Sequence, residues 1–335
     1  MYSVDVIIPS YKPDQKLRKL LELLLRQSYP IQNIIIINTE KALLDPALIP
    51  EDARISVTHI RKDQFDHGAS RNLGVSKSDA ELFLMMTEDA VPKDTTLVEK
   101  LVRVFETDPY KDAVPKNHSR GPIGAVYGRQ LATQESSYDE QYARQFNYPA
   151  QSFVKTQQDL ARLGIKTYFE SNVCCMYRRD IFDRLGGFIE HTIFNEDMIY
   201  CGKLLQAGYA SAYEASAEVY HAHHYSGCQQ FHRNFDLGVS QADHPEIFAG
   251  LRSEGEGVKL VLGNAKDLLR RGRLFTVPNL VWKSGCKYLG FRMGCNYRKL
   301  SRRMVLRCTM NPRYWAHADR CIEKNDDHSG DRKNR

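Results

Sequence analysis

The chain lacks a long apolar segment, an export signal and any cysteine pair with the spacing of a metal site. No run of about 18 or more apolar residues occurs in its 335 residues, so the sequence predicts no membrane-spanning helix. The first residues, Met1 to Asp5, lead directly into an apolar segment, and we expect no signal peptide. None of the eight cysteines forms a Cys-x-x-Cys pair. Scattered thiols without an export signal favour a reducing compartment, so a cytoplasmic location is expected.

Two common nucleotide-binding signatures are also missing. There is no Gly-x-Gly-x-x-Gly motif after a strand and no Gly-Lys-Ser/Thr of a P-loop, so neither an NAD site nor an ATP-type site is indicated. The segment 9–13, Pro-Ser-Tyr-Lys-Pro, stands where a nucleotidyltransferase would carry a Gly-rich basic loop. A hydrophobic content of 42% is nevertheless enough for a folded core, which excludes a disordered chain.

Charge is distributed unevenly along the chain. Residues 250–335 hold 20 Lys and Arg against 8 Asp and Glu, a net charge of +12, while residues 1–249 have a net charge of −6. In the basic part, arginines such as Arg270 and Arg273 interleave with apolar and aromatic residues such as Phe275 and Trp282. This pattern favours a helix on the anionic inner face of the cell membrane, which would make the protein peripheral. A solvated helical face packed on the rest of the chain is the alternative, and nucleic acid is the least favoured partner.

The first ~240 residues alternate apolar strands with amphipathic helices, which predicts an α/β fold. Residues 4–8 and 33–37 read as buried parallel strands around a helix that Asp14 would cap. Further strands are expected at 55–60, 81–86, 123–128, 168–177 and 215–221, and helices after Thr96-x-x-Glu99 and at 197–206. The pattern fades near 240–256. We therefore expect a catalytic domain at 1–245 and a basic, mainly helical region at 246–335, with its last ~10 residues disordered.

Polar residues follow several of the predicted strands. Ligands of open parallel sheets bind at the carboxyl ends of the strands, so these residues are the candidates for a site. They are Pro9-Ser10-Tyr11, Asn38-Thr39-Glu40, Thr87-Glu88-Asp89 and Asn195-Glu196-Asp197.

Acidic residues at two of these positions suggest chemistry. Glu88 and Asp89 could hold Mg²⁺ or Mn²⁺ against two phosphates, although a solvated acidic turn would look the same. Glu196 and Asp197 open a predicted helix, where one of them could act as a general base. The alternative is that the helix dipole stabilises these acids by about 0.3–1 kcal/mol each without any catalysis.

Histidine and arginine residues supply two further candidates. His221 and His223 share one face of a predicted strand and could bind a metal or a phosphate, unless both are structural. Arg71 and Asn72 follow a glycine turn, and Arg71 could bind a phosphate with two hydrogen bonds. The alternative for that turn is an ordinary helix start capped near Ser70.

In their order along the chain, these motifs resemble the GT-A-fold family 2 glycosyltransferases over roughly residues 3–240. The resemblance rests on 6–11, 34–37, His67-Gly68-x-Ser70-Arg71-Asn72, Thr87-Glu88-Asp89-Ala90 and Glu196-Asp197. Five stretches look like the rhamnosyltransferase-like branch: Asp66–Asn72, Thr87–Pro92, Gly128-Arg129-Gln130, Phe146-Asn147-Tyr148-Pro149 and Ser171-Asn172-Val173.

The resemblance implies a GT-A fold, that is a Rossmann-like, mostly parallel sheet flanked by helices, and it implies roles for single residues. Asp197 matches the catalytic base, Asp89 the second acid of the Asp-x-Asp metal motif, and His221 a metal-binding histidine with His223 as the alternate. The residues implied in nucleotide-sugar binding are Pro9, Ser10, Tyr11, Asn38, Glu40, Arg71, Asn72, Glu88, Asp89, Arg129, Asn172 and Glu196.

The implied activity is inverting transfer of a sugar to a lipid-linked glycan in surface polysaccharide synthesis. The expected donor is dTDP-L-rhamnose, with UDP-sugars as the alternative, and the expected cofactor is Mg²⁺ or Mn²⁺. Thr87 replaces the first acid of the metal motif and Asn38 replaces an aspartate beside the base. These departures weaken the case for tight metal binding and leave a non-catalytic nucleotide-sugar-binding protein as another interpretation. The oligomeric state stays open.

Overall fold

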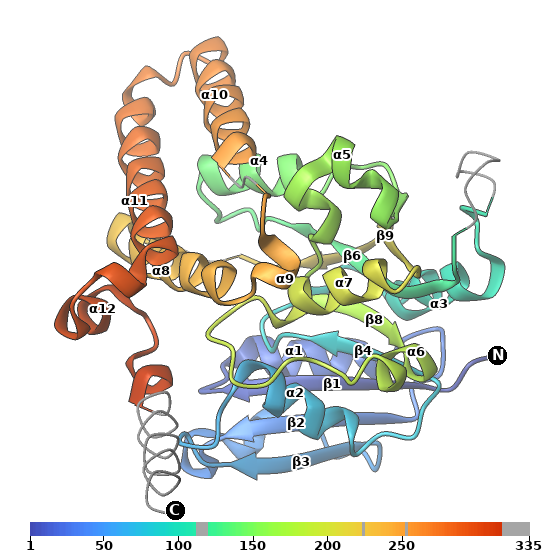
Figure 1. Cartoon of the computed structure of the whole chain (residues 1–335). Helices are drawn as coiled ribbons and strands as arrows, with labels where there is room; N and C mark the ends of the chain where they lie inside the picture. The colour runs from blue at the N-terminus through green and yellow to red at the C-terminus, as the bar shows by residue number, and fades with distance from the viewer. Residues whose placement is uncertain (112–119, 223–224, 252–253, 317–335) are drawn as a thin grey trace, which may run out of the picture.

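The computed structural model describes residues 1–111, 120–222, 225–251 and 254–316, and its centre is a nine-stranded sheet (Figure 1). The strand order is β3-β2-β1-β4-β8-β6-β9-β5, and β7 pairs with β9. The strands are β1 (Val4–Tyr11), β2 (Asn33–Thr39), β3 (Ile55–Ile60), β4 (Leu82–Met86), β5 (Val91–Pro92), β6 (Ile123–Leu131), β7 (Phe153–Lys155), β8 (Cys174–Arg178) and β9 (Ala210–Tyr220).

The sheet is mixed, and its direction reverses at β8. Strands β3, β2, β1 and β4 run parallel, whereas β8 is antiparallel to both of its neighbours, β4 and β6. Strand β9 then runs parallel to β6. The carboxyl ends of β1, β2, β4, β6 and β9 therefore share one edge of the sheet. The α/β fold is confirmed, and so is the clustering of the candidate strand ends at one edge.

The described residues also form twelve α-helices. They are α1 (Gln15–Leu24), α2 (His67–Val75), α3 (Leu97–Thr107), α4 (Tyr138–Asn147), α5 (Leu160–Leu163), α6 (Arg179–Arg184), α7 (Glu196–Gln206), α8 (Gly227–Asp243), α9 (Pro245–Phe248), α10 (Glu254–Arg270), α11 (Val277–Cys295) and α12 (Arg302–Cys308).

Helix starts follow the sequence in one case and depart from it in another. The Asp14 carboxylate accepts a hydrogen bond from the Lys16 N–H and caps α1, as expected. The capping box expected at Thr96 and Glu99 is wrong, because the Thr96 side chain makes no cap. Its hydroxyl and N–H both donate to Asp94 instead, and Glu99 accepts a hydrogen bond from Ser28.

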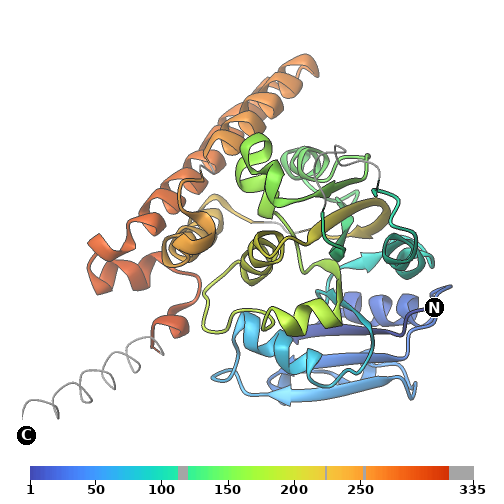
Figure 2. The same cartoon turned by 45° about the vertical axis from the view of Figure 1, so that its right-hand side comes forward.

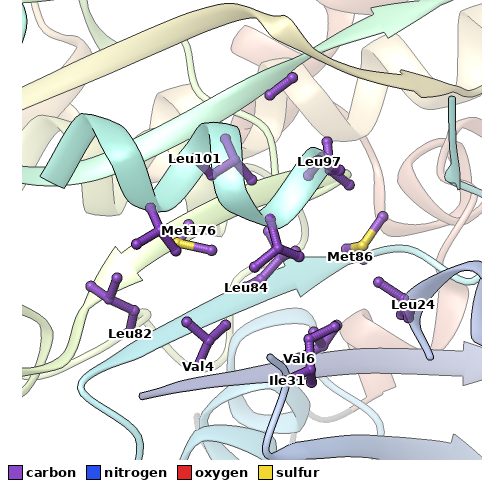
Figure 3. Close-up of a cluster of buried hydrophobic side chains, with 14 of the residues drawn as sticks. Val4, Val6, Leu24, Ile31, Leu82, Leu84, Met86, Leu97, Leu101 and Met176 are labelled. Carbon is purple, nitrogen blue, oxygen red and sulfur yellow. The ribbon is translucent and has the colours of Figure 1, made fainter. Parts of the chain in front are cut away.

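Alternate residues of the central strands fill two cores, one on each face of the sheet. On one face, Val6 of β1 and Leu84 of β4 lie among buried residues that include Leu101 of α3 (Figure 3). On the other face, Ile7 and Phe83 lie in a second buried cluster that includes Tyr200 of α7. Because both faces are covered, these strands are continuously apolar, and the short apolar runs of the sequence are explained.

The C-terminal helices form a hairpin that projects from the body of the molecule. Figures 1 and 2 both show α10 and α11 side by side, reaching beyond the sheet and its helices. None of the helices in the described ranges is long and apolar enough to cross a membrane. Helix α8 lies before the boundary expected near residue 245, yet it packs closely on α11. The domain division therefore stays a prediction, and the tail expected to be disordered lies outside the described residues.

Candidate functional site

The acidic loop after β4 is tied to the end of β1 by one carboxylate. Glu88 accepts hydrogen bonds from the Ser10 hydroxyl at 2.6 Å and from the Tyr11 N–H at 3.0 Å. Burial raises the pKa of Glu88 to about 7. Glu88 therefore fixes the loop, and the neighbouring acid, Asp89, is held at the edge of the sheet.

Asp89 faces His221, which follows β9. The Asp89 Oδ1 and His221 Nε2 atoms are 3.5 Å apart. Burial lowers the pKa of His221, which favours the neutral imidazole, even though Asp89 opposes the effect. The other ring nitrogen lies 3.0 Å from the Gln130 Oε1 atom and 3.2 Å from the Arg144 guanidinium. If Nδ1 donates to Gln130, the lone pair of Nε2 points toward Asp89.

The second acidic pair opens α7 and is held by a left-handed residue. Asn195 has a φ of 66°, a conformation that asparagine tolerates better than most residues. Glu196, the next residue, pairs with Arg71 at 3.2 Å and accepts a hydrogen bond from the Asn172 side chain at 3.1 Å. Asp197 accepts hydrogen bonds from the backbone N–H groups of Asn172, at 3.2 Å, and Met198, at 2.8 Å.

These adjacent carboxylates have opposite electrostatic surroundings. Burial and the charge of Glu196 raise the pKa of Asp197 to about 7. Burial alone would also raise the pKa of Glu196, but Arg71 and His67 outweigh it and lower that pKa. Glu196 is therefore the ionised partner of Arg71, and Asp197 can gain or lose a proton near neutral pH. A carboxylate with this pKa suits general base catalysis.

The two acidic segments are joined by a short series of contacts. The Asn172 backbone donates to Asp197, and the preceding residue, Ser171, accepts a hydrogen bond from the Gln130 side chain at 3.0 Å. The same Gln130 side chain lies against His221, which faces Asp89. The structure thus brings Asp89 and Asp197 to the same edge of the sheet, as the interpretation of the motifs required.

Residues at the ends of β1 and β2 form the opposite end of this edge. Asn38 is fully buried, and its amide donates to the Glu40 carbonyl oxygen at 3.1 Å. Its Oδ1 atom has no hydrogen-bond partner among the described residues. Glu40 adopts a φ of 67° and accepts a hydrogen bond from the Lys62 N–H at 2.6 Å. Tyr11 lies beside Lys62 and Lys12, whose ammonium groups are 5.2 and 5.4 Å from its ring centre. The lysines give this end a positive field.

Three predicted residues have protein partners that limit what else they can contact. Asn72 donates to the Phe188 carbonyl oxygen and accepts from the Phe188 N–H, so it fixes the segment before α7. Arg71 donates to the His67 carbonyl oxygen as well as pairing with Glu196. Arg129 pairs with Glu218 at 3.2 Å, near the ends of β6 and β9. Direct nucleotide contacts of Arg71, Asn72 and Arg129 stay predictions.

Sequence reasoning missed several side chains around these acids. Gln130 and Arg144 contact His221, although no motif assigned them a role. The guanidinium carbon of Arg233, on α8, lies 4.5 Å from the ring centre of Phe194. Burial lowers the pKa of Arg233 despite the nearby Asp197 carboxylate. Gln130 and Tyr148 belong to motifs of the resemblance, and that was the available signal. The others come from elements far apart in the chain, so spacing could not reveal them.

A divalent cation would find two suitable protein atoms here. Among the described residues, no group of three or more His, Cys, Asp and Glu could hold a metal ion. The Asp89 carboxylate and the neutral His221 imidazole do face each other, and Mg²⁺ commonly takes only one or two carboxylates, with substrate phosphates and water completing its shell. The residues present therefore fit an ion that is shared with a diphosphate. His223 lies outside the described residues.

Comparison with known proteins identifies relatives across most of the chain. Residues 5–186 match the model of Glycosyl transferase family 2. The O-antigen chain rhamnosyltransferase RfbN of Salmonella typhimurium strain LT2 is 36% identical over 317 residues, which cover 93% of this chain and 96% of that protein. The O-antigen chain rhamnosyltransferase WbaN of Salmonella anatum is 32% identical over 320 residues, covering 94% and 96%.

Solved structures share the fold at lower identity. The mannosyltransferase PcManGT from Pyrobaculum calidifontis, in complex with GDP-Man and Mn²⁺, gives a TM-score of 0.58 at 14% identity and covers 89% of this chain and 88% of that one. TarS residues 1–349 from S. aureus, in complex with UDP-GlcNAc, gives a TM-score of 0.50 at 14% identity, covering 89% and 92%. These likenesses support the GT-A fold.

Proposed function

The chain belongs to glycosyl transferase family 2, and we propose that it is an inverting enzyme that transfers L-rhamnose from dTDP-rhamnose to a lipid-linked glycan. The product would be a surface polysaccharide. The two relatives named as O-antigen chain rhamnosyltransferases support the sugar and the pathway class. The observation that carries the reaction is the placement of Asp197, a partly buried carboxylate with a pKa of about 7, on the same edge as Asp89 and His221.

In the proposed reaction, Asp197 takes the proton from an acceptor hydroxyl as its oxygen attacks the anomeric carbon of the donor. The bond between that carbon and the diphosphate oxygen breaks, and its electron pair leaves with the diphosphate. A single displacement inverts the anomeric centre and needs no covalent enzyme intermediate. A Mg²⁺ or Mn²⁺ ion held by Asp89 and His221 would neutralise the charge on the leaving diphosphate.

Glu196 and Asn172 support this step without touching the reacting atoms. Asn172 holds the Asp197 carboxylate through its backbone and binds Glu196 through its side chain. Arg71 keeps Glu196 ionised, and the negative charge of Glu196 strengthens Asp197 as a base. The residues at the ends of β1 and β2, together with Glu88, would hold the nucleoside and diphosphate.

We further propose that the α10–α11 hairpin rests on the anionic inner face of the cell membrane, where a lipid-linked acceptor is found. The turn between the two helices exposes Leu274 and almost the whole of Phe275, at 98% exposure. Arg270 and Arg273 flank these side chains and are exposed as well. Exposed apolar side chains beside arginines are the combination that anionic bilayers bind, and nucleic acid would not require the apolar part.

The donor is tested by a thermal-shift screen of dTDP-rhamnose, UDP-sugars and GDP-sugars, with and without Mn²⁺. A ligand at 100 times its dissociation constant stabilises the folded chain by about 2.7 kcal/mol, which is readily measured. We expect dTDP-rhamnose with Mn²⁺ to give the largest shift and to be slowly hydrolysed. A larger shift and faster hydrolysis with a UDP-sugar would replace the rhamnose donor in this proposal.

A further inference from the structure

A pocket of about 440 Å³ opens at the carboxyl ends of β6 and β9. Its walls come from the segment 129–134, from one face of α4, and from Tyr148 and Tyr220. The volume lies within the range of about 300–1,000 Å³ that is common for small-molecule sites. Apart from Arg129, none of the side chains that form it was assigned to the donor.

The pocket adjoins both acidic segments of the site. Gln130 and Arg144 form part of its wall, and both contact His221, which faces Asp89. The Gln130 amide also donates to Ser171, whose neighbour Asn172 holds the Asp197 carboxylate. A ligand in this pocket would therefore touch side chains that contact His221, and a short series of contacts joins it to Asp197.

The chemistry of the wall fits a neutral, hydroxyl-rich ligand. Arg129 shares the Glu218 carboxylate with Lys93, and Arg144 lies 3.8 Å from the Glu140 carboxylate, so each arginine of the wall has a carboxylate partner. Amide side chains supply both donors and acceptors, as vicinal hydroxyl groups require. They belong to Gln130, Gln134, Gln141 and Gln145. Two tyrosines add apolar ring surface with a polar tip.

The position of the pocket separates it from the donor end of the sheet. Strands β4 and β8 lie between β1, where the nucleoside is proposed to bind, and β6, where the pocket opens. The lysines near Tyr11 suit a phosphate-bearing ligand at the donor end. In the pocket, the arginines already have carboxylate partners, so it is less suited to a phosphate-bearing ligand.

We propose that this pocket binds the terminal neutral sugar of the acceptor glycan and presents its hydroxyl to Asp197. The proposal rests on the transferase function given above and names the part of the acceptor that the chain recognises. Gln145 and Tyr220, both exposed at the surface of the pocket, would then determine acceptor specificity without taking part in the chemistry.

The test fills the pocket from its exposed rim. In Gln145→Trp, the new side chain starts from an exposed position of α4, so the core is not disturbed. The probes are octyl glycosides of neutral hexoses, with octyl glucuronide as the anionic counterpart. We expect the acceptor KM to rise about tenfold or more for the neutral probes, with dTDP-rhamnose hydrolysis and donor KM unchanged. The matched control is Glu135→Trp, which alters an exposed neighbour outside the wall and should leave both KM values unchanged.

Direct binding separates failure of this proposal from failure of the transferase function. Calorimetric titration of the full chain with the octyl hexosides needs no donor turnover. We expect wild type and Glu135→Trp to bind the hexosides with equal affinity, and Gln145→Trp to bind them about tenfold more weakly. Equal hexoside binding in wild type and Gln145→Trp would overturn the pocket assignment. The assignment would also be overturned if wild type bound inorganic pyrophosphate more tightly than any hexoside and Gln145→Trp abolished the pyrophosphate binding. That result would identify an anion site. Hexoside binding by a chain that hydrolyses no nucleotide sugar would instead reject the transferase function alone.

Discussion

At the scale of single residues, the neighbours Glu196 and Asp197 show how position decides the role of a carboxylate. The first lies against Arg71, and the second is partly buried and accepts hydrogen bonds from two backbone N–H groups. The sequence has two acids in a row and no indication of which one would keep a proton. The tertiary contact with Arg71 makes that distinction.

Replacing Asp197 with asparagine removes the proposed base while keeping the shape of the side chain. We expect turnover to fall by about 10²–10⁴-fold, with donor affinity nearly unchanged, because the donor does not bind through this group. Steady-state transfer and donor binding are measured together. Asp180→Asn, at a carboxylate that pairs with Arg178 near the opposite edge of the sheet, serves as the control. Near-normal transfer by Asp197→Asn would remove this residue from the mechanism.

The raised pKa of Asp197 predicts how activity depends on pH. A base works when it is ionised, so kcat/KM should rise as the pH passes through about 7 and then level off. The measurement is a pH profile between pH 5 and 9. A profile that is already level from pH 5 upward would show that the group titrates at the ordinary value of a carboxyl.

The same pKa has an opposite effect on stability. Because the pKa of Asp197 is higher in the folded chain than in the unfolded chain, the folded state retains the proton to higher pH. This contribution to stability is present below the unfolded pKa of about 4 and is lost as the pH rises through about 7. Between pH 5 and 8, wild type should therefore lose more stability than Asp197→Asn, as urea unfolding at both pH values can measure. Equal losses in the two proteins would contradict the shift.

How far residues can be predicted depends on whether their partners are near in sequence. The acids and their strand ends follow from local pattern, and Asn172, Arg71 and Glu196 follow from the resemblance. Gln130, Arg144 and Arg233 contact residues that are distant in sequence and flank β9, β8 or α7, so the folded chain is needed to bring them into the site. Asn72 shows the reverse case, since a residue expected near the nucleotide also fastens a loop.

At the scale of elements, the crossing of α8 and α11 depends on glycine. A methyl group at Gly290 would collide with the Phe231 carbonyl oxygen, and one at Gly294 with that of Phe235. Gly238 of α8 faces Gly294 in the same crossing. The helices therefore pack with their backbones in near contact, which ordinary side chains would prevent.

Gly290→Ala is expected to destabilise the chain by about 1–3 kcal/mol, because the methyl group forces the two helices apart. The control is Gly285→Ala in the same helix, where nothing lies within 4 Å of the added atom. Alanine should stabilise α11 there by about 0.5–1 kcal/mol. Thermal unfolding compares the two. A Gly290→Ala protein as stable as Gly285→Ala would show that the crossing is looser than described.

Element boundaries were predictable where a local signal was uncontested. Residues 55–60 form β3 as expected. Strand β8, expected from residue 168, starts at Cys174, because Tyr168 ends a 3₁₀ helix and residues 169–173 form an irregular turn. At α3, the predicted capping box failed because Asp94, two residues earlier, bonds both polar groups of Thr96. Competition between neighbouring polar side chains is not visible in spacing.

At the scale of the whole molecule, the charge asymmetry of the sequence corresponds to a projecting structure. The hairpin that carries the basic residues also exposes apolar side chains along its length, among them Val258, Leu262, Val281, Trp282 and Leu289. The sequence pattern favoured a membrane surface as partner, which stays a proposal, whereas the hairpin geometry and the exposed turn at Leu274 and Phe275 needed the fold.

Replacing Leu274 and Phe275 together with serine should reduce binding to vesicles that contain anionic lipid, with activity on soluble octyl glycosides retained. Both side chains are exposed, so folding should not change. Co-sedimentation at low and high salt measures the effect, and the electrostatic part should weaken as salt rises. Leu43→Ser, at an exposed apolar residue of the opposite half, is the control. Equal, salt-insensitive binding of wild type to neutral and anionic vesicles would contradict the proposal.

Helix α4 meets the hairpin at its first residues and lines the pocket with residues toward its end, Arg144 and Gln145. Tyr138 lies under Arg273 at 5.1 Å, and Asp139 accepts a hydrogen bond from Asn264 of α10. The helix has ten residues and is therefore about 15 Å long. If the hairpin turn touches the bilayer, the distance from the lipid headgroups to the sugar pocket is roughly the length of α4, about 15 Å. Such an enzyme would extend glycans while they are still short and close to their lipid anchor, and a long polymer would have to fold back to present its far end.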